Sequence, residues 1–553
     1  MAHAGPEPSV SFDTKPYNWT HWKLDIQGAV ATMSMDIELH GGFRPGYELK
    51  LNSYDIGVDF ELNDIIERLR FEHPAVRCVV ITSAIDRVFC SGANIRMLAS
   101  SSHPFKVNFC KYTNETRCGI EDASEHSNIR FIAALNGACA GGGYELAMAC
   151  DDIYLVDDGS SAVSLPEVPL LGVLPGTGGL TRLTDKRKVR RDVADVFCTK
   201  AEGFKAREAL KGRLIDGAFP RSKWADGIQK KAEEVVADTA DTSDLKGIKL
   251  TALSPETTDT GLAFSYVTLD VNEKSRVATL TVKAPDAAPP TSHDELHAMG
   301  ENAWSLQAWR ELERALLELR FNHQDIGLIL LHTRGDADKL IAWDNALAQL
   351  AEDGSWLARE SLLFQARTLR RLDNMARSMF ALIDEEHCFH GSFFEFALSA
   401  DRSYMFLDED EENAVQVTNA SAGRFLMAND KTRLGIRFLG EPDKVEEILE
   451  MGEPILAEDA EDLGLVTASP DDIDWDDEIR IAIEERVSMS PDALTGMEQN
   501  LRFGGIETCE TKIYGRLSAW QNWIFQRPNA VGDQGALTLY GHPERPVFDY
   551  RRT

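Results

Sequence analysis

The stretch ALNGACAGGGYELAMACDDIYLV, residues 134–156, decides the fold of this 553-residue chain. It reads as a short strand, three consecutive glycines, an apolar helix and an apolar strand. Gly142 opens the helix, where unpaired amide hydrogens and the positive end of the helix dipole favour a negative oxygen; tight packing of the helix start is the alternative. Glu145 lies inside the apolar helix, so a catalytic carboxylate and a structural ion pair are both open.

Two further stretches flank this helix in the sequence. RVFCSGANIRML, residues 87–98, places a glycine before a predicted helix, so the Ala93 amide can point at an anion; an ordinary turn is the alternative. SLPEVPLLGVLPGTGGLTRL, residues 164–183, holds Glu167 between two prolines. If the strand before it runs back past the helix start, Glu167 and Glu145 face one pocket, as general acid–base chemistry requires.

Taken in order, F-C-S-G-A-N-I, A-G-G-G-Y-E-L-A and L-P-E-V-P-L-L-G-V-L-P-G-T-G-G-L-T-R-L resemble the crotonase (enoyl-CoA hydratase/isomerase) superfamily. The resemblance implies an α/β fold, a crotonase-like spiral of ββα units. It also implies an oxyanion hole, in which the Ala93 and Gly142 amides bind the thioester carbonyl of a CoA ester. Glu145 and Glu167 match the two acid–base glutamates of the hydratases.

Four residues near these motifs need separate interpretation. Arg87 and Arg96 match basic positions that often meet CoA phosphates in the superfamily, and solvated surface charge explains them equally well. Asn94 stands where many members have Asp, and Tyr144 replaces a smaller residue beside the catalytic helix position. These two departures narrow the part of the superfamily that the chain resembles.

The same unit occurs twice in the chain. IIERLRFEHPAVRCVVITS (residues 65–83) and ALLELRFNHQDIGLILLHT (residues 315–333) share an LRF-x-H core 250 residues apart, and residues 134–156 align with 384–406 at the same shift. A constant offset over this length indicates a duplicated domain.

Each copy has the same predicted order of elements. Alternating apolar residues predict hairpins over 23–36 and 268–283, and helical spacing predicts helices over about 59–72 and 309–322. An apolar β-branched strand follows each helix. Strands and helices in alternation indicate a layered α/β fold.

The second copy lacks the residues of the first copy's site. In the second copy the oxyanion motif becomes HTRGDADKLIAWDN, the triple glycine becomes GSF, and Glu167 aligns with Val417. Glu395 keeps the place of Glu145 without the rest of the constellation, so we expect a structural role for it.

The chain divides into four predicted parts. These are an active domain (1–236), a polar linker (237–261), a degenerate domain (262–480) and a helical C-terminal region (481–553). Within the last part, LSAWQNWIF (517–525) is apolar enough to pack into a core, the favoured interpretation, or against a second subunit.

Composition excludes several classes of function. The formal charge of −32 disfavours nucleic acid, an RNA-binding relative of the superfamily and anionic membranes. Nine cysteines without a C-x-x-C pair disfavour a zinc cage and a disulfide framework and indicate a reducing cytoplasm. MAHAGPEPSV at the N-terminus lacks the features of an export signal, and no apolar run is long enough to span a bilayer. Acidic clusters at Asp408–Glu412 and Asp471–Glu478 are interpreted as solvated surface.

The whole chain, including the C-terminal GHPERPVFDYRR, also resembles a ring-opening branch of the superfamily. That resemblance implies conversion of 2,3-epoxy-2,3-dihydrobenzoyl-CoA and water to 3,4-didehydroadipyl-CoA semialdehyde and formate, with no metal or redox cofactor. Members of the superfamily are usually oligomers, and we expect a homodimer. Two alternatives stay open. One is an ordinary enoyl-CoA hydratase or isomerase, and the other is a non-catalytic protein of the same fold that binds CoA esters.

Overall fold

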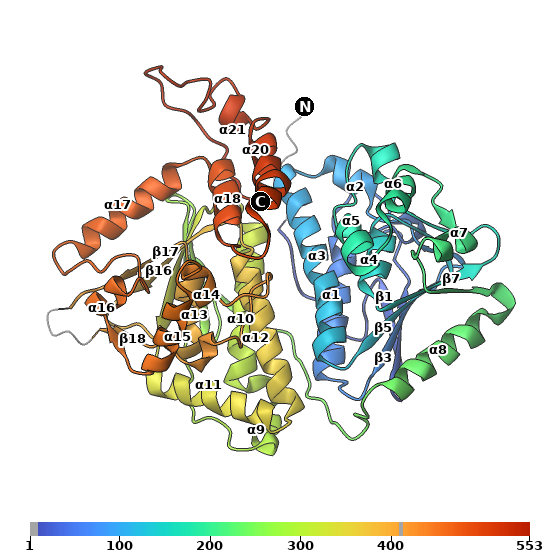
Figure 1. Ribbon diagram of the computed structural model, residues 1–553, viewed down its shortest axis with the longest axis horizontal. Coiled ribbons are helices and arrows are strands. Elements are labelled where there is room, and N and C mark those ends of the chain that lie inside the picture. Colours follow the sequence, from blue (N-terminus) through green and yellow to red (C-terminus); the bar gives the residue numbers. More distant parts are fainter. Residues whose placement is uncertain (1–8, 409–412) are drawn as a thin grey trace. The chain divides into compact units, whose positions relative to one another are not determined.

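The computed structural model describes residues 9–408 and 413–553, and its backbone forms two compact units, 1–252 and 253–553 (Figure 1). The boundary between the units lies within the predicted linker. Asp471–Glu478 is exposed apart from Trp475, which is half-buried. The other predicted acidic cluster is Asp408–Glu412, and its residues 409–412 lie outside the described residues.

The first unit holds two sheets. The six-stranded sheet has the order β1-β2-β3-β5-β7-β10, with the bounds Trp22–Gln27, Val30–Met35, Cys78–Ser83, Arg130–Leu135, Asp152–Asp157 and Gly217–Pro220. The four-stranded sheet has the order β4-β6-β8-β9, with the bounds Arg87–Cys90, Gly137–Ala140, Ala162–Ser164 and Phe204–Lys205. The second sheet carries the glycine turns of the site.

Helices cover these sheets. Those of the first unit are α1 (Ile56–Phe71), α2 (Ile95–Ser100), α3 (His103–His126), α4 (Gly142–Ala149), α5 (Gly179–Thr181), α6 (Arg191–Thr199), α7 (Ala206–Lys211) and α8 (Trp224–Asp238). Shorter helical turns span Lys50–Asn52, Glu167–Leu171, Arg182–Lys186 and Arg221–Lys223.

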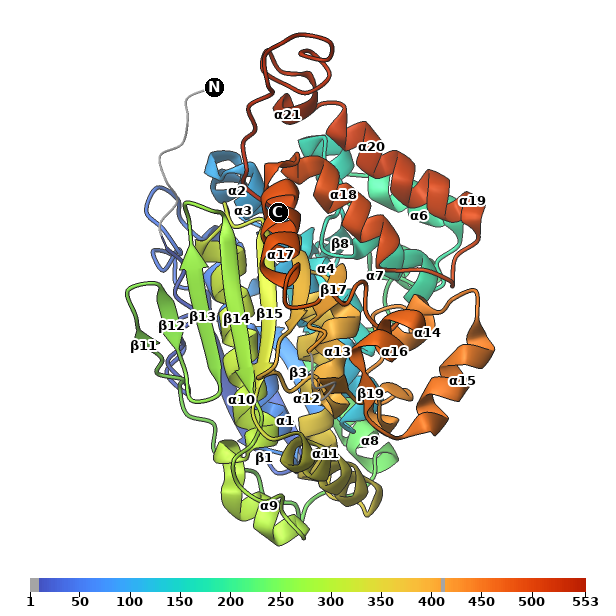
Figure 2. The same ribbon diagram turned by 90° about the vertical axis from the view of Figure 1, so that its left-hand side faces the viewer.

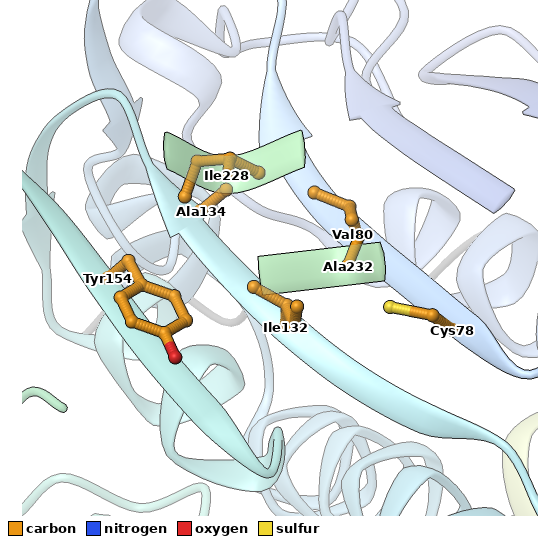
Figure 3. Close-up of a cluster of buried hydrophobic side chains, with 7 residues drawn as sticks. All are labelled: Cys78, Val80, Ile132, Ala134, Tyr154, Ile228 and Ala232. Carbon is orange, nitrogen blue, oxygen red and sulfur yellow. The ribbon is translucent and has the colours of Figure 1, made fainter. Parts of the chain in front are cut away.

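One core of the first unit lies between α8 and the six-stranded sheet. Figure 3 shows Ile228 and Ala232 of α8 against side chains of β3, β5 and β7. Because β3 and its neighbours run parallel and are buried on both faces, their sequences are continuously apolar, as CVVITS and RFIAAL illustrate.

The second unit repeats this plan. Its seven-stranded sheet has the order β11 to β17, with the bounds Glu256–Thr257, Gly261–Ala263, Val267–Asn272, Val277–Lys283, Leu328–Arg334, Ser378–Ile383 and Arg402–Met405. A two-stranded sheet pairs β18 (Ala414–Val415) with β19 (Ile455–Leu456). Figure 2 shows β13, β14 and β15 side by side.

The helices of the second unit cover its sheet and continue to the C-terminus. They are α9 (His293–Met299), α10 (Trp304–Asn322), α11 (Ala337–Glu352), α12 (Trp356–Asp373), α13 (Gly391–Ser399), α14 (Arg433–Arg437), α15 (Pro442–Met451), α16 (Ala457–Asp462), α17 (Trp475–Ser488), α18 (Pro491–Leu501), α19 (Cys509–Lys512), α20 (Ser518–Ile524) and α21 (Pro528–Val531). Helical turns span Gly300–Asn302, Asn419–Ser421 and Ile513–Leu517.

The predicted hairpins and the strands after them are confirmed in both copies. In the first unit β1 pairs antiparallel with β2, which pairs parallel with β3. In the second, β13 pairs antiparallel with β14, which pairs parallel with β15. The helices between them, α1 and α10, begin three and five residues before their predicted starts at 59 and 309.

The C-terminal helices differ from the prediction in two ways. The predicted boundary at 480 falls inside α17, because Ile479 and Ala482 pack on the second sheet as α8 packs on the first. In addition, the predicted core packing of 517–525 is wrong. Trp520 and Ile524 of α20 approach Gly496 of α18, but no residue of α20 is buried. No helix of the described residues is long and apolar enough to cross a membrane.

Candidate active site

The turn that carries Ala93 lies at the end of β4. Gly92 adopts φ +85°, and an added Cβ there would lie 2.9 Å from Ala140 O, so the position requires glycine. The backbone of Tyr54 holds the turn from both sides, because Tyr54 N donates to Gly92 O at 2.9 Å and Asn94 N donates to Tyr54 O at 2.8 Å. Ala93 itself is half-buried.

The turn that carries Gly142 begins α4. Gly141 adopts φ +53°, and its own amide donates to Ser164 O at 2.9 Å. Its carbonyl accepts from the amides of Tyr144 and Glu145, as the start of a helix requires. Gly142 is half-buried, whereas Gly141 and Gly143 on either side of it are buried.

The two turns touch each other. A Cβ added to Gly92 would lie 3.1 Å from Gly142 N, and one added to Gly142 would lie 3.5 Å from Ala93 N. Within the described residues, the backbone hydrogen bonds of these turns do not use the Ala93 and Gly142 amides as donors. Two neighbouring, half-buried N–H groups without partners are what a developing oxyanion needs.

Glu145 is buried, 2% exposed, on the first turn of α4. Its Oε1 accepts from the amides of Thr177 at 2.9 Å and Gly179 at 2.8 Å, and its Oε2 accepts from the Thr177 hydroxyl at 2.5 Å. Three donors hold the side chain, and among the described residues none of its hydrogen-bond partners is cationic, which suits a carboxylate that is kept in one rotamer. The structural ion pair that the sequence left open is therefore absent among the bonds of Glu145.

Glu167 opens a helical turn between Pro166 and Pro169 and is half-buried. Burial raises the pKa of Glu167 to about 7, with a smaller contribution from the nearby charge of Glu145. Its Oε2 is buried and has no hydrogen-bond partner among the described residues. A carboxyl group with this pKa and an unused oxygen can both give and accept a proton near neutral pH.

Both glutamates lie at the glycine turn. A Cβ added to Gly141 would lie 2.7 Å from Glu167 Oε1, and one added to Gly142 would lie 3.9 Å from Glu145 Oε2. The structure therefore brings Glu145 and Glu167 together beside the Gly142 amide. The arrangement can hold an enolate oxygen while protons move to and from the adjoining carbon.

The two candidate CoA-binding arginines are exposed at the surface of the first unit. Arg87 is well exposed, and its Nε lies 3.5 Å from Asp86 Oδ2, so its local partner is a surface acid. Arg96 is exposed on α2, immediately after the Ala93 turn. Contact with CoA phosphates stays a prediction for both residues.

The two departures from the superfamily pattern have structural explanations. Asn94 caps α2 by accepting from Met97 N at 3.0 Å, and its amide donates to Glu48 O at 2.8 Å, a bond that Asp cannot make. Tyr144 is fully buried and donates to Leu214 O at 2.6 Å, so it points away from Glu145 into the core.

The corresponding place in the second unit is filled by the chain itself. Ser392, the counterpart of Gly142, donates its amide to Asp344 Oδ2 at 2.7 Å. Glu395 is bound by Arg433 at 2.8 Å and by the Ser421 hydroxyl at 2.5 Å. The Ser392 amide and the Glu395 carboxylate therefore both bond other residues of the same unit. The ion pair of Glu395 agrees with the structural role expected for it.

Sequence reasoning missed three residues that hold the site. Thr177 binds Glu145 from the stretch 164–183, and nothing in the sequence connects that part of the stretch to α4. Arg117 and Asp59 form a buried ion pair beneath the glycine turns. Charged residues on two helices give no sequence signal that distinguishes such a pair from a solvated surface.

No group of three or more His, Cys, Asp or Glu side chains within residues 9–408 and 413–553 is arranged to hold a metal ion.

Comparisons with known proteins find similarity to enzymes that act on CoA esters. A family model described as enoyl-CoA hydratase/isomerase matches residues 48–266. Benzoyl-CoA-dihydrodiol lyase from Aromatoleum evansii is 50% identical over 544 residues, covering 98% of this chain and 98% of that protein. The alpha subunit of a fatty acid oxidation complex from Idiomarina loihiensis is 33% identical over 166 residues, 30% of this chain and 22% of that one. A solved enoyl-CoA hydratase from Geobacillus kaustophilus is 30% identical with a TM-score of 0.34, covering 39% of this chain and 74% of that one.

Proposed function

The chain belongs to the crotonase superfamily, in the family of benzoyl-CoA-dihydrodiol lyases, and from this premise we propose that it opens the ring of 2,3-epoxy-2,3-dihydrobenzoyl-CoA. The substrate and two waters give 3,4-didehydroadipyl-CoA semialdehyde and formate, a step in aerobic benzoate degradation. The enzyme is a carbon–carbon lyase. The observation that carries this proposal is the meeting of two available amides and two glutamates at one glycine turn.

The oxyanion hole fits the bond that must break. The carbon that leaves as formate is bonded to the carbon bearing the thioester, so cleavage leaves an electron pair alpha to the thioester carbonyl. The resulting enolate places negative charge on the thioester oxygen. Ala93 N–H and Gly142 N–H would donate to that oxygen, and loss of one such donor typically costs about 10²–10³ in rate.

The two glutamates divide the proton transfers. We assign Glu145, which donors hold in one orientation, to taking the proton from the attacking water. Glu167, with a pKa near 7, gives its proton to the oxygen that leaves the opening epoxide. The second water attacks the carbon that leaves as formate and gives a proton to the ionised Glu167. Glu167 then returns this proton to the alpha carbon, and its unused oxygen is available for both transfers.

The proposed reaction is redox-neutral. Epoxide opening and hydrolytic loss of formate add water and move protons, so the balance requires no electron acceptor and no metal-bound oxidant. We propose that the CoA thioester is the partner that the site recognises and that coenzyme A enters only as part of the substrate. Arg87 and Arg96 are proposed to meet its phosphates.

The alternatives make different products. An ordinary hydratase or isomerase uses the same four groups but keeps every carbon of the acyl chain, whereas a binding protein turns nothing over. The likeness to the lyase over 98% of both chains favours ring opening. We further propose a cytoplasmic homodimer; exposed apolar side chains such as Phe525 and Leu537 support self-association.

Supplying enzymatically epoxidised benzoyl-CoA tests the proposal. We expect formate and the six-carbon semialdehyde in equal amounts, detected by a formate-coupled assay and by mass spectrometry. A hydrated or isomerised product that retains all carbons, or no turnover, would overturn the assignment. Light scattering of the purified protein tests the dimer.

A further inference from the structure

A buried ion pair contacts the Gly142 turn directly and the Ala93 turn through Tyr54. Asp59 of α1 is 0% exposed and Arg117 of α3 is 1% exposed, with 3.2 Å between Arg117 Nη1 and Asp59 Oδ1. Thr116 also donates to Asp59 Oδ2 at 2.8 Å. Because desolvation of a buried pair can exceed its Coulomb energy, such a pair is weak evidence of a stabilising role.

On one side the pair reaches the Gly142 turn. Arg117 Nη2 donates to Gly142 O at 3.3 Å, and Nη1 donates to Thr113 O at 2.9 Å on its own helix. The planar guanidinium thus fixes the first turn of α4 against α3. That turn carries the Gly142 amide.

On the other side the pair reaches the Ala93 turn. Asp59 Oδ1 accepts from the Tyr54 hydroxyl, and the Arg117 guanidinium lies 5.4 Å from the centroid of the Tyr54 ring. The backbone of Tyr54 holds the residues before and after Ala93. One side chain therefore connects the ion pair to the second turn.

We propose that the Asp59–Arg117 pair is a positioning device that sets the distance between the two amides of the oxyanion hole. This inference rests on the proposed function, because it concerns the same site. A continuous series of contacts runs from Ala93 through Tyr54, Asp59 and Arg117 to Gly142. Neither charged group touches the thioester, so both act through the backbone turns that they hold. Arg117 also attracts the carboxylate of Glu145 electrostatically.

A second ion pair provides a matched control. Arg70 of α1 and Asp122 of α3 join the same two helices, with 2.8 Å between Arg70 Nη2 and Asp122 Oδ2, and Arg70 is 2% exposed. Arg70 also donates to Ser127 at 2.9 Å, beyond the C-terminal end of α3. Its loss should disturb helix packing to a similar degree while leaving the oxyanion turns in place.

The test compares Arg117→Gln with Arg70→Gln in the full chain. We expect both variants to lower Tm. Arg117→Gln should lower kcat for formate release about 10²-fold, as misplacement of a group by about 1 Å can, with little change in KM. Arg70→Gln should keep kcat within about twofold of the unaltered enzyme.

A spectroscopic readout separates positioning from general destabilisation. Difference infrared spectra of bound benzoyl-CoA, which lacks the epoxide and is not turned over, report the polarisation of its thioester carbonyl. The unaltered protein and Arg70→Gln should shift this band to lower frequency, and Arg117→Gln should return it toward the solution value.

Three outcomes decide the matter. The pattern just described supports the inference. An unchanged band and unchanged kcat in Arg117→Gln, or equal losses in both variants, overturn it while formate release by the unaltered protein preserves the proposed function. No band shift and no formate with the unaltered protein overturn the proposed function itself. If Arg117→Gln does not fold, Arg117→Lys replaces it, because one ammonium group then stands in for the two guanidinium nitrogens that separately bond Asp59 and Gly142. An intermediate loss is expected, and unchanged kcat and band overturn the inference.

Discussion

Arg433, in the T-R-L run at 432–434 of the second unit, binds Glu395 at 2.8 Å, and Arg182, in the T-R-L run at 181–183 of the first unit, binds Glu121 at 2.8 Å. The arginine that neutralises the glutamate in one copy is thus committed to another acid in the other copy. Glu145 is left to hydroxyl and amide donors, which hold a carboxylate without supplying a counter-charge.

This difference predicts that Glu395→Gln affects stability and not turnover. The substitution weakens a buried charged hydrogen bond while Asp373 still pairs with Arg433, so we expect a loss of about 1–3 kcal/mol in the free energy of unfolding. Thermal unfolding and formate release measure the two effects. A folded variant that releases no formate would contradict the structural role.

Glutamine at either catalytic position should abolish formate release. Glu145→Gln and Glu167→Gln each remove a group that transfers protons, and such groups contribute about 10²–10⁴ in rate. Binding of benzoyl-CoA, measured by calorimetry, should persist because the amide donors remain. Full activity in either variant would remove that residue from the mechanism.

Thr177→Ala should impair turnover more than stability. The variant loses the hydroxyl that binds Glu145 Oε2 but keeps the Thr177 amide, so we expect kcat to fall about 10-fold and stability by about 1 kcal/mol. Thr184→Ala is the control, since that exposed hydroxyl donates to the carbonyls of Leu180 and Thr181 in its own helical turns. Equal kcat values in the two variants would show that Thr177 does not orient the carboxylate.

The raised pKa of Glu167 predicts a pH-dependent stability. Its folded pKa of about 7 lies above the ordinary value near 4.5 that it has when unfolded. Between these values the folded state holds the proton more tightly, so this group favours folding at low pH and loses that contribution as pH rises through 7. The glutamine of Glu167→Gln does not titrate. The Tm of this variant minus the Tm of the unaltered protein should therefore increase between pH 5 and pH 8. A constant Tm difference would contradict a raised pKa.

Local patterns in the sequence predicted much of this fold. Alternation predicted both hairpins, and the glycine motifs predicted the turns at Ala93 and Gly142, because these features depend on residues near one another. The domain boundary at 480 could not be placed correctly from the sequence. α17 has the amphipathic pattern of any surface helix, and the pattern does not say which sheet the apolar face covers. The exposure of α20 likewise has no local signal.

The residues that hold the site in place could not be predicted from local patterns. Thr177 is 32 residues from Glu145 and Arg117 is 58 residues from Asp59, so their contacts depend on how the layers pack. Glu167 was expected beside Glu145 only if the intervening strand returned past α4. That strand is β7, and the return occurs.

A crystal structure of the protein with benzoyl-CoA tests the central claim most directly. We predict that the thioester oxygen lies about 2.7–3.1 Å from both Ala93 N and Gly142 N, with the adjoining ring carbons facing Glu145 and Glu167. A thioester oxygen that bonds neither amide, or a ring bound away from the two carboxyl groups, would contradict the account.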